Sequence, residues 1–292
     1  MSVRFLKMEA AGNDFLLFDD RSGEMERLPA DHWGDLCRRR TGVGADGVLL
    51  LQEASGVDFR MCYLNADGGE AGMCGNGARC LAWAAALEFG LGHGLEPDTP
   101  RPEGWEPPPG VGHRQVWTVG FEAADGPHRA LGWDRQVVLT LRDPTPPTTC
   151  RLPVAGGTVQ GQRVDTGVPH LVVRVEDPGT VAVEEAGPPL RAHPDLGPKG
   201  TNVDWVSAAP DADGAWRIRT WERGVEAETL ACGTGAGAAA AVLAADGVVS
   251  PVALRTRGGE VLQVHFRRAG AGIDDLWLEG PVRLVYRGDL IL

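Results

Sequence analysis

Short segments in which apolar residues alternate with polar ones, or run together for several positions, dominate the chain. Strands that are buried on one or both faces have these patterns, and helical patterns between them are few. The sequence therefore predicts antiparallel or mixed sheets rather than alternating strand and helix units. The predicted strands lie at 3–8, 15–19, 47–52, 58–65, 114–122, 135–143, 170–176, 202–208, 216–224, 252–257, 260–266, 274–280 and 282–288.

Three segments have a helical pattern, at about 29–40, 74–88 and 232–245. The second, "CGNGARCLAWAAALE", and the third, "CGTGAGAAAAVLAA", are apolar on nearly every face. A helix that is apolar all round must be buried, so each is predicted to lie inside a curling sheet. One such helix in each half of the chain predicts two similar units.

The length of 292 residues is typical of two domains. A proline-rich stretch at 141–152 lies near the midpoint, and we place the domain boundary just before it, near residue 135. A second segment rich in proline and glycine, 91–112, is predicted to be a surface insertion without a core of its own.

Composition narrows the class of partner. The formal net charge of −12 and the pI near 5.0 argue against a nucleic-acid partner and favour a small molecule. No apolar run is long enough for a membrane helix, and the N-terminus alternates like a strand, so we expect a soluble cytoplasmic protein. We expect the six cysteines to be reduced, and no spacing typical of metal ligands is present. The cysteines are Cys37, Cys62, Cys74, Cys80, Cys150 and Cys232.

Cofactor motifs are weak. The glycines of "GVGADG", 42–47, precede a strand pattern where a dinucleotide site needs a helix, so they are interpreted as a turn. Lys7 and Lys199 are the two lysines of the chain, and neither lies in a convincing pyridoxal phosphate site. No cofactor is therefore expected.

Two of the cysteines have equivalent surroundings. Cys74 and Cys232 each begin a predicted buried helix and are each followed by Gly, a polar residue, Gly and Ala. The N-terminus of a helix is expected to lower the pKa of a thiol. One such cysteine would suggest a hydrolase nucleophile with His170 as its partner, which leaves the second element unexplained. Two facing thiols, a thiolate and a thiol, instead fit the inversion of a carbon between them.

Six motifs occur in a familiar order. They are "AGNDF" (11–15), "RTGVGADG" (40–47), "YLNADGGEAGMCGNGARC" (63–80), "DTGVPH" (165–170), "GTNVDWV" (200–206) and "WERGVEAETLACGTGAGAAAA" (221–241). With this order the sequence resembles the diaminopimelate epimerase family, isomerases that work without pyridoxal phosphate. The resemblance implies epimerisation of LL-2,6-diaminopimelate to the meso isomer, in lysine and peptidoglycan precursor biosynthesis. A racemase of another amino acid on the same scaffold is the alternative.

The resemblance also implies an architecture. The fold class is α/β (α+β), with two pseudo-symmetric halves, each a mixed, mostly antiparallel curled sheet wrapped around a central buried helix. Residues 1–135 and the returning tail 281–292 form the half that carries Cys74, and residues 136–280 form the half that carries Cys232. The family resemblance further implies a homodimer.

The site implied by the resemblance has two ends. One of Cys74 and Cys232 removes the α-proton as a thiolate, and the other delivers a proton to the opposite face. The α-carboxylate rests on backbone N–H groups of both helix starts, and His170 and Glu222 tune the thiols. The residues that bind the α-carboxylate are Gly75, Asn76, Gly233 and Thr234, and those that bind the rest of the substrate are Asn13, Asn65, Asn202, Glu222 and Arg223.

Two positions depart from the family pattern. Val168 stands in "GVPH" where the family often has asparagine, and Gly47 stands where some members have glutamine. Both positions belong to the substrate site in those members. The departures therefore bear on substrate identity more than on the type of reaction.

Overall fold

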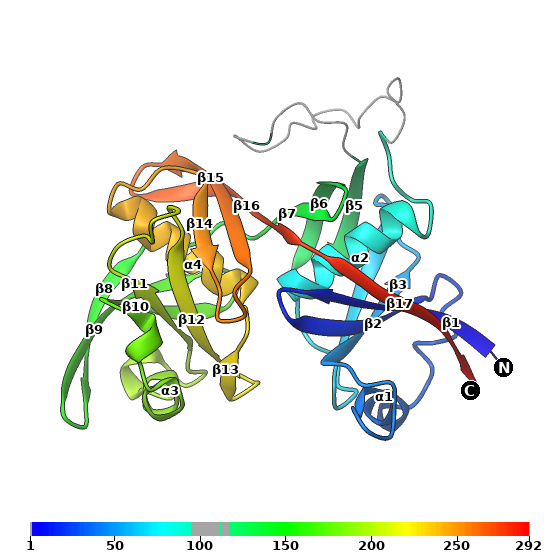
Figure 1. Cartoon of the computed structure of the whole chain (residues 1–292), viewed down its shortest axis with the longest axis horizontal. Helices are drawn as coiled ribbons and strands as arrows, with labels where there is room; N and C mark the ends of the chain where they lie inside the picture. The colour runs from blue at the N-terminus through cyan, green and yellow to red at the C-terminus, as the bar shows by residue number, and fades with distance from the viewer. Residues whose placement is uncertain (1, 95–110, 112–116, 292) are drawn as a thin grey trace. The chain divides into compact units, whose positions relative to one another are not determined.

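The computed structural model describes residues 2–94, 111 and 117–291 (Figure 1). These residues form a mixed α/β structure of many strands with four α-helices. They fall into two compact units, one made of 2–94, 117–139 and 280–291 and the other of 111 and 140–279. Within the described residues, none of the helices has the length and apolar character needed to cross a membrane.

The first unit contains one sheet in which β17 pairs with β1, β1 with β2, and so on in order to β7. The pairings β2–β3 and β4–β5 are parallel, and the other five are antiparallel. The strands are β1 (Ser2–Ala10), β2 (Asn13–Asp19), β3 (Gly47–Gln52), β4 (Phe59–Asn65), β5 (Trp117–Ala123), β6 (Gly126–Trp133), β7 (Gln136–Thr140) and β17 (Arg283–Ile291).

Helix α2 (Gly75–Leu87) packs against β1 to β6, and 11 of its 13 residues are buried. Figure 1 shows it in cyan among the blue strands of this unit. Small residues allow the close approach: the α-carbon of Gly77 lies so near Leu49 and Phe15 that a Cβ there would be 3.1 Å and 3.5 Å from their side chains. The predicted buried helix at 74–88 is confirmed.

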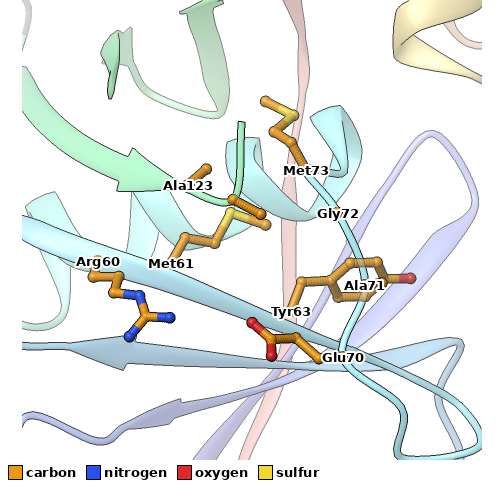
Figure 2. Close-up of a pocket in the computed structure, with 9 residues that line it drawn as sticks. Arg60, Met61, Tyr63, Glu70, Ala71, Gly72, Met73 and Ala123 are labelled. Carbon is orange, nitrogen blue, oxygen red and sulfur yellow. The ribbon is translucent and has the colours of Figure 1, made fainter. Parts of the chain in front are cut away.

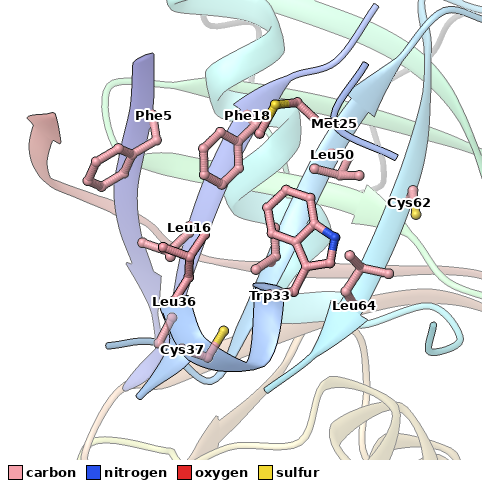
Figure 3. Close-up of a cluster of buried hydrophobic side chains, with 12 residues drawn as sticks. Phe5, Leu16, Phe18, Met25, Trp33, Leu36, Cys37, Leu50, Cys62 and Leu64 are labelled. Atoms are coloured by element: carbon pink, nitrogen blue, oxygen red, sulfur yellow. The ribbon is translucent and has the colours of Figure 1, made fainter. Parts of the chain in front are cut away.

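The opposite face of the first sheet carries α1 (Ala30–Cys37). Since side chains alternate along a strand, Leu16 and Phe18 face away from Phe15 and pack with α1. The Trp33 ring meets the Phe18 ring edge to face, with centroids 5.6 Å apart. Figure 3 shows Trp33 reaching from α1 toward Phe18 and Leu50. The sheet is thus covered by a helix on each face.

The second unit repeats this order of pairings. From β8 to β12 each strand pairs with the next, parallel at β10–β11 and antiparallel elsewhere. Strand β12 pairs with β13 and, in parallel, with β14, and β14, β15 and β16 continue antiparallel. The strands are β8 (Thr148–Val154), β9 (Gly157–Asp165), β10 (Pro169–Val175), β11 (Asn202–Ser207), β12 (Trp216–Glu222), β13 (Ala227–Thr229), β14 (Val252–Arg255), β15 (Val261–Ala269) and β16 (Gly272–Pro281).

Helix α4 (Gly233–Ala245) is the counterpart of α2, with 11 of 13 residues buried and contacts to β9, β10, β11 and β15. Helix α3 (Val183–Arg191) packs elsewhere, in a cluster with Leu171, Val203 and Trp221. Short 3₁₀ turns, η1 (Pro178–Thr180) and η2 (Pro194–Leu196), precede and follow α3.

The sequence pattern missed several elements. Helix α3 was not predicted because Pro188 and Pro189 lie inside it, and interior prolines normally break a helix. Strand β8 lies where a proline-rich boundary segment was predicted; its Pro153 is exposed, as edge strands allow. Strands β6, β9 and β13 were also missed. Most of the predicted insertion at 91–112 lies outside the described residues; in its described part, His93 exchanges two 2.9 Å backbone hydrogen bonds with Thr118.

Candidate active site

Cys74 is the N-cap residue of α2. Its backbone is extended (φ −118°, ψ 113°), and its carbonyl accepts the first helical hydrogen bond from Ala78 N–H at 2.8 Å. Gly75 and Asn76 therefore occupy the first turn, where N–H groups have no acceptor within the helix itself. The local sequence thus places a half-buried thiol beside a helix N-terminus, as predicted.

The turn between β1 and β2 brings Asn13 to this thiol. The Cys74 Sγ lies 3.8 Å from Asn13 Oδ1 and donates to it. On its other side, Asn13 Nδ2 donates to Asp46 Oδ2 at 2.8 Å. Because a carboxylate can only accept, Asp46 fixes the Asn13 amide with its oxygen toward the sulfur. The "GVGADG" loop therefore serves to position Asn13, and it leads into a strand as expected for a turn.

An ion network holds the two loops together. Asp14 lies 2.6 Å from Lys7 Nζ and accepts two hydrogen bonds from Arg39, at 2.7 Å and 3.0 Å. Arg39 also donates to Asp46 at 2.6 Å, and Lys7 donates to the carbonyl of Gly44. Burial opposes ionisation of Asp14, but hydrogen bonds from Arg39 and Lys7 outweigh it and lower its pKa to about 2.

Lys7→Met is expected to reduce the free energy of unfolding by about 2 kcal/mol at pH 7, since it leaves Asp14 partly unpaired in a buried site. The lowered pKa means that ionised Asp14 stabilises the fold above about pH 4, and that this contribution disappears as the pH falls toward 2. The variant should therefore lose less stability than the wild type on acidification. Urea unfolding at pH 7 and pH 3 measures both effects.

Arg21→Met is the matched control, because Arg21 forms an exposed pair with Asp19 at 2.5 Å. This substitution should reduce the free energy of unfolding by no more than about 0.5 kcal/mol. Equal losses for the two variants would contradict a specific role for the buried lysine.

Cys232 is the N-cap residue of α4, with nearly the same backbone conformation as Cys74 (φ −119°, ψ 115°). Its Sγ accepts from Gly235 N–H at 3.4 Å and lies 3.4 Å from Thr234 Oγ1. The first turn of α4 contains Gly233 and Thr234. Both cysteines therefore occupy the same position relative to their helix.

The prediction that the helix N-terminus lowers the thiol pKa is wrong for Cys232. Burial raises its pKa well above the ordinary value of 9.0, and the charges of Glu222 and Asp204 raise it further. The hydrogen bonds from Thr234 and Gly235 act in the opposite direction but are outweighed. Cys232 in this structure is consequently a thiol at neutral pH.

Glu222 ends β12 and faces the same thiol. Burial raises its pKa above the ordinary value of 4.5, although a hydrogen bond from Thr229 Oγ1 partly offsets this. The charge of Glu222 in turn raises the pKa of the Cys232 thiol, so the two groups are electrostatically coupled. This coupling is consistent with the tuning role that the family resemblance implies for Glu222.

His170, near the start of β10, is fully buried and is hydrogen-bonded to Asp204 of β11: Nδ1 lies 2.7 Å from Asp204 Oδ2. Asp204 also accepts from Thr220 Oγ1 at 2.8 Å. Sequence reasoning singled out His170 and missed Asp204. A signal was present, because an acidic residue inside the apolar run "NVDWVS" of a buried strand requires a partner.

The residues predicted for the distal end of the substrate lie beside this pair. Asn202 is buried; its Oδ1 accepts from Arg223 N–H at 2.8 Å, and its Nδ2 lies 3.4 Å from His170 Nε2. The Arg223 guanidinium has one long hydrogen bond, 3.5 Å, to the carbonyl of Lys199. The second unit therefore gathers Cys232, Glu222, His170, Asn202 and Arg223 around one set of strand ends.

The first unit gathers fewer predicted residues. Asn65 is exposed at the end of β4 and stands opposite Gly47 in the β3–β4 register. A Cβ at Gly47 would come within 2.6 Å of both the Tyr63 ring and the Leu64 carbonyl, so Tyr63 fills the space that a side chain at 47 would need. In the second unit, Val168 is half-buried, and its carbonyl accepts from Thr166.

Each unit contains a pocket near its predicted site residues. The pocket in Figure 2 is lined by Met61 and Tyr63 of β4 and by Met73, which precedes Cys74, and it includes none of the predicted site residues. A larger pocket in the second unit is lined by His170, together with Arg163 and other residues of β9 and the loop before β11. Among the described residues, no three His, Cys, Asp or Glu side chains are grouped so that they could hold a metal ion.

Comparison with known proteins identifies the family. The sequence matches diaminopimelate epimerase over residues 5–92 and 163–273. It is 37% identical over 301 residues to the diaminopimelate epimerase of Aquifex aeolicus, covering 99% of this chain and 98% of that protein. It is 39% identical over 289 residues to the enzyme of Chlorobaculum tepidum, covering 98% of this chain and 100% of that protein.

Among solved structures, a hydroxyproline epimerase from Agrobacterium vitis superposes with a TM-score of 0.68 at 20% identity, over 99% of this chain and 92% of that one. That likeness concerns the fold. The full-length sequence matches go further: the resemblance predicted from the motifs is confirmed, and the chain belongs to the diaminopimelate epimerase family.

Proposed function

We propose that this chain epimerises LL-2,6-diaminopimelate to the meso isomer by a two-base mechanism in which Cys74 and Cys232 exchange protons with the α-carbon. The activity follows from family membership, since full-length relatives from several organisms have this name. The assignment of the cysteines is supported by one observation above all: each is the N-cap of a buried helix, with matching backbone angles.

Cys74, as the thiolate, first removes the α-proton from one face of the α-carbon. The raised pKa of Cys232 keeps a proton on its sulfur, and Cys232 delivers that proton to the opposite face of the carbanion. After this step Cys74 is the thiol and Cys232 is the thiolate, so the reverse reaction begins with Cys232 as the base. The two cysteines thus exchange roles as the reaction reverses.

The α-carboxylate binds the first-turn N–H groups of α2 and α4. Helix starts attract anions, because these N–H groups have no intrahelical partner and the helix dipole adds positive charge. As the α-proton leaves, negative charge flows into the carboxylate, and preorganised donors then stabilise it more strongly than in the ground state. The residues that donate are Gly75, Asn76, Gly233 and Thr234.

The distal end of the substrate carries a second carboxylate and a second ammonium group. Arg223 binds the carboxylate through its planar fork, which one 3.5 Å hydrogen bond leaves largely available. The other residues that contact the distal end are Glu222 and the amides Asn202, Asn65 and Asn13. Val168 contributes no polar group where many relatives have asparagine, so this chain relies more strongly on Arg223.

The two units are pseudo-symmetric halves, each a curled sheet around its buried helix. Both follow the same series of pairings: an antiparallel hairpin, a parallel step, an antiparallel step and a second parallel step. The buried helix follows the corresponding strand in each half, after β4 in one and after β12 and β13 in the other. Such equivalence supports equivalent roles for the two thiols.

Incubation of the purified protein in deuterated water with LL- or meso-diaminopimelate tests the proposal. We expect interconversion without added pyridoxal phosphate, and incorporation of deuterium at the α-carbon of the product. Proline and glutamate serve as alternative substrates in parallel reactions. Faster inversion of either would assign the chain to another amino acid, and the absence of α-hydrogen exchange with all of these amino acids would contradict the epimerase proposal.

We also propose the homodimer that the resemblance implies, and the cytoplasmic location that the hydropathy pattern predicts. Sedimentation equilibrium of the purified chain tests the first, with a mass near twice 31.0 kDa as the expected result. A mass near that of one chain would contradict the dimer.

A further inference from the structure

A buried carboxylate that belongs to none of the expected site residues lies at the centre of the second unit. The Asp204 side chain is fully buried, and its two oxygens contact different partners: Oδ2 lies 2.7 Å from His170 Nδ1, and Oδ1 accepts from Thr220 Oγ1 at 2.8 Å. Burial of a carboxylate is costly unless its oxygens are hydrogen-bonded. These contacts satisfy that requirement, and they also constrain the histidine.

The contacts of His170 select one tautomer of its ring. Asp204 can only accept, so the hydrogen at this end is on Nδ1. At the other end, Asn202 Oδ1 accepts from Arg223 N–H, which leaves the Asn202 Nδ2 group facing His170 Nε2 at 3.4 Å. An amide NH₂ can only donate, so Nε2 carries a lone pair. Asp204 therefore holds a hydrogen on Nδ1, and Asn202 favours a lone pair on Nε2.

We propose that Asp204 is a positioning residue of the acid–base centre, which holds His170 as the Nδ1–H tautomer so that Nε2 remains a proton acceptor beside Asn202 and the distal site. This inference rests on the proposed function, because it assigns His170 a role as an acceptor in the epimerase. Asp204 acts through His170 and touches no reacting atom. The hydrogen-bonded series Asp204, His170, Asn202 and Arg223 connects the buried centre to the group that binds the distal carboxylate.

The Asp204 carboxylate packs tightly against the start of helix α4. A Cβ at Gly235 would lie 2.4 Å from Asp204 Oδ1, so Asp204 lies directly against the first turn of α4. A helix N-terminus stabilises a negative charge there. The glycine of "CGTG" is therefore required by the carboxylate beneath it, which gives a physical reason for that part of the motif.

The position of Asp204 also affects Cys232. The charged groups around this thiol are Glu222 on β12, Asp204 on β11 and His170 on β10, and the charges of both carboxylates raise its pKa. Neutralising Asp204 removes one of the two charges. The thiol should then ionise at lower pH, although its burial is unchanged.

Asp204→Asn tests the proposal with little change in shape. The amide oxygen of the variant can still accept from Thr220, but the amide NH₂ would donate to His170 Nδ1 and force the hydrogen onto Nε2, opposite Asn202 Nδ2. In serine proteases, the equivalent change beside a catalytic histidine lowers kcat by about 10⁴-fold. We expect a fall in kcat of about 10² to 10⁴-fold with KM changed by less than about threefold, because the substrate contacts remain.

Two readouts do not depend on activity. Nitrogen-15 NMR of labelled histidine should show His170 protonated on Nδ1 in the wild type and on Nε2 in Asp204→Asn. Alkylation of Cys232 by iodoacetamide should begin at lower pH in the variant than in the wild type, because one of the charges that raise the thiol pKa is gone. Thr220→Val is the matched control: it removes the other hydrogen bond to Asp204 and should leave the Nδ1–H tautomer in place.

The outcomes separate the two proposals. A wild-type His170 protonated on Nε2, or on both nitrogens, overturns the role of Asp204 whether or not the enzyme epimerises diaminopimelate. An Asp204→Asn variant that keeps the Nδ1–H tautomer of His170 and the wild-type kcat also overturns the role of Asp204. If Asp204→Asn fails to fold, the wild-type spectrum decides alone. A wild type that is inactive on diaminopimelate but has the expected tautomer overturns the proposed function and supports the positioning role.

Discussion

Cys74→Ala and Cys232→Ala are each expected to reduce epimerisation by about 10³-fold or more, because each removes the proton carrier on one face of the α-carbon. The surviving thiol can still exchange the α-hydrogen on its own face. We therefore expect each single variant to retain some exchange with deuterated solvent, one with the LL isomer and the other with the D centre of the meso isomer. Neither single variant should invert its substrate. The double variant should exchange the α-hydrogen of neither isomer.

Nuclear magnetic resonance of the α-hydrogen during incubation measures exchange and inversion together. Cys150→Ala is the matched control, since Cys150 is half-buried in β8 and donates a hydrogen bond to the Gly161 carbonyl, away from the expected site. It should leave both rates unchanged. Interconversion at a near wild-type rate in either single variant would refute the two-base assignment, and loss of all exchange in one variant alone would point to a single nucleophile.

Arg223→Lys is expected to raise KM by about 10- to 100-fold, with a smaller effect on kcat. A lysine keeps the charge but cannot form two parallel hydrogen bonds to a carboxylate. The effect should be large here because the side chain of Val168 offers no polar contact to the substrate where the family often has asparagine. Steady-state kinetics with both isomers measures it.

Arg267→Lys provides the control for this change, because Arg267 is exposed and pairs with Asp274 and Asp275 on the surface. Its kinetics should match the wild type. An unchanged KM for Arg223→Lys would argue against a substrate with a distal carboxylate. Val168→Asn supplies the complementary test: it should be tolerated and should lower KM if the asparagine of related enzymes restores a contact.

Much of this fold follows from local pattern. Helices α2 and α4 could be predicted with the cysteines that precede them, because alanine on every face requires burial and Cys-Gly-polar-Gly marks the N-cap and first turn of each helix. Most strands were predicted for a similar reason, since apolar alternation reflects the two faces of a sheet. These signals depend on residues close together in sequence.

The electrostatics of the site depends on residues far apart in sequence, and sequence reasoning failed there. Cys232 was expected to have a lowered pKa from its helix alone. Burial raises this pKa instead, and the charges of Glu222 and Asp204, which lie on strands β12 and β11, raise it further. Asp204 meets His170 only because β10 and β11 pair in parallel, with His170 opposite Asn202. Neither that register nor the depth of burial can be derived from the motifs alone.

The last strand of the chain pairs with the first. Ser2 stands opposite Ile291, and the register continues to Glu9 opposite Arg283 (Figure 1). During synthesis on a ribosome, β1 is made long before β17. The edge of β1 that pairs with β17 therefore stays unpaired until β17 has left the exit tunnel. The continuous unit at 140–279 can fold before then, whereas the first sheet keeps an open edge. Truncations or bulky fusions at the C-terminus should therefore impair folding of the half that carries Cys74, although no residue of β17 belongs to the expected site.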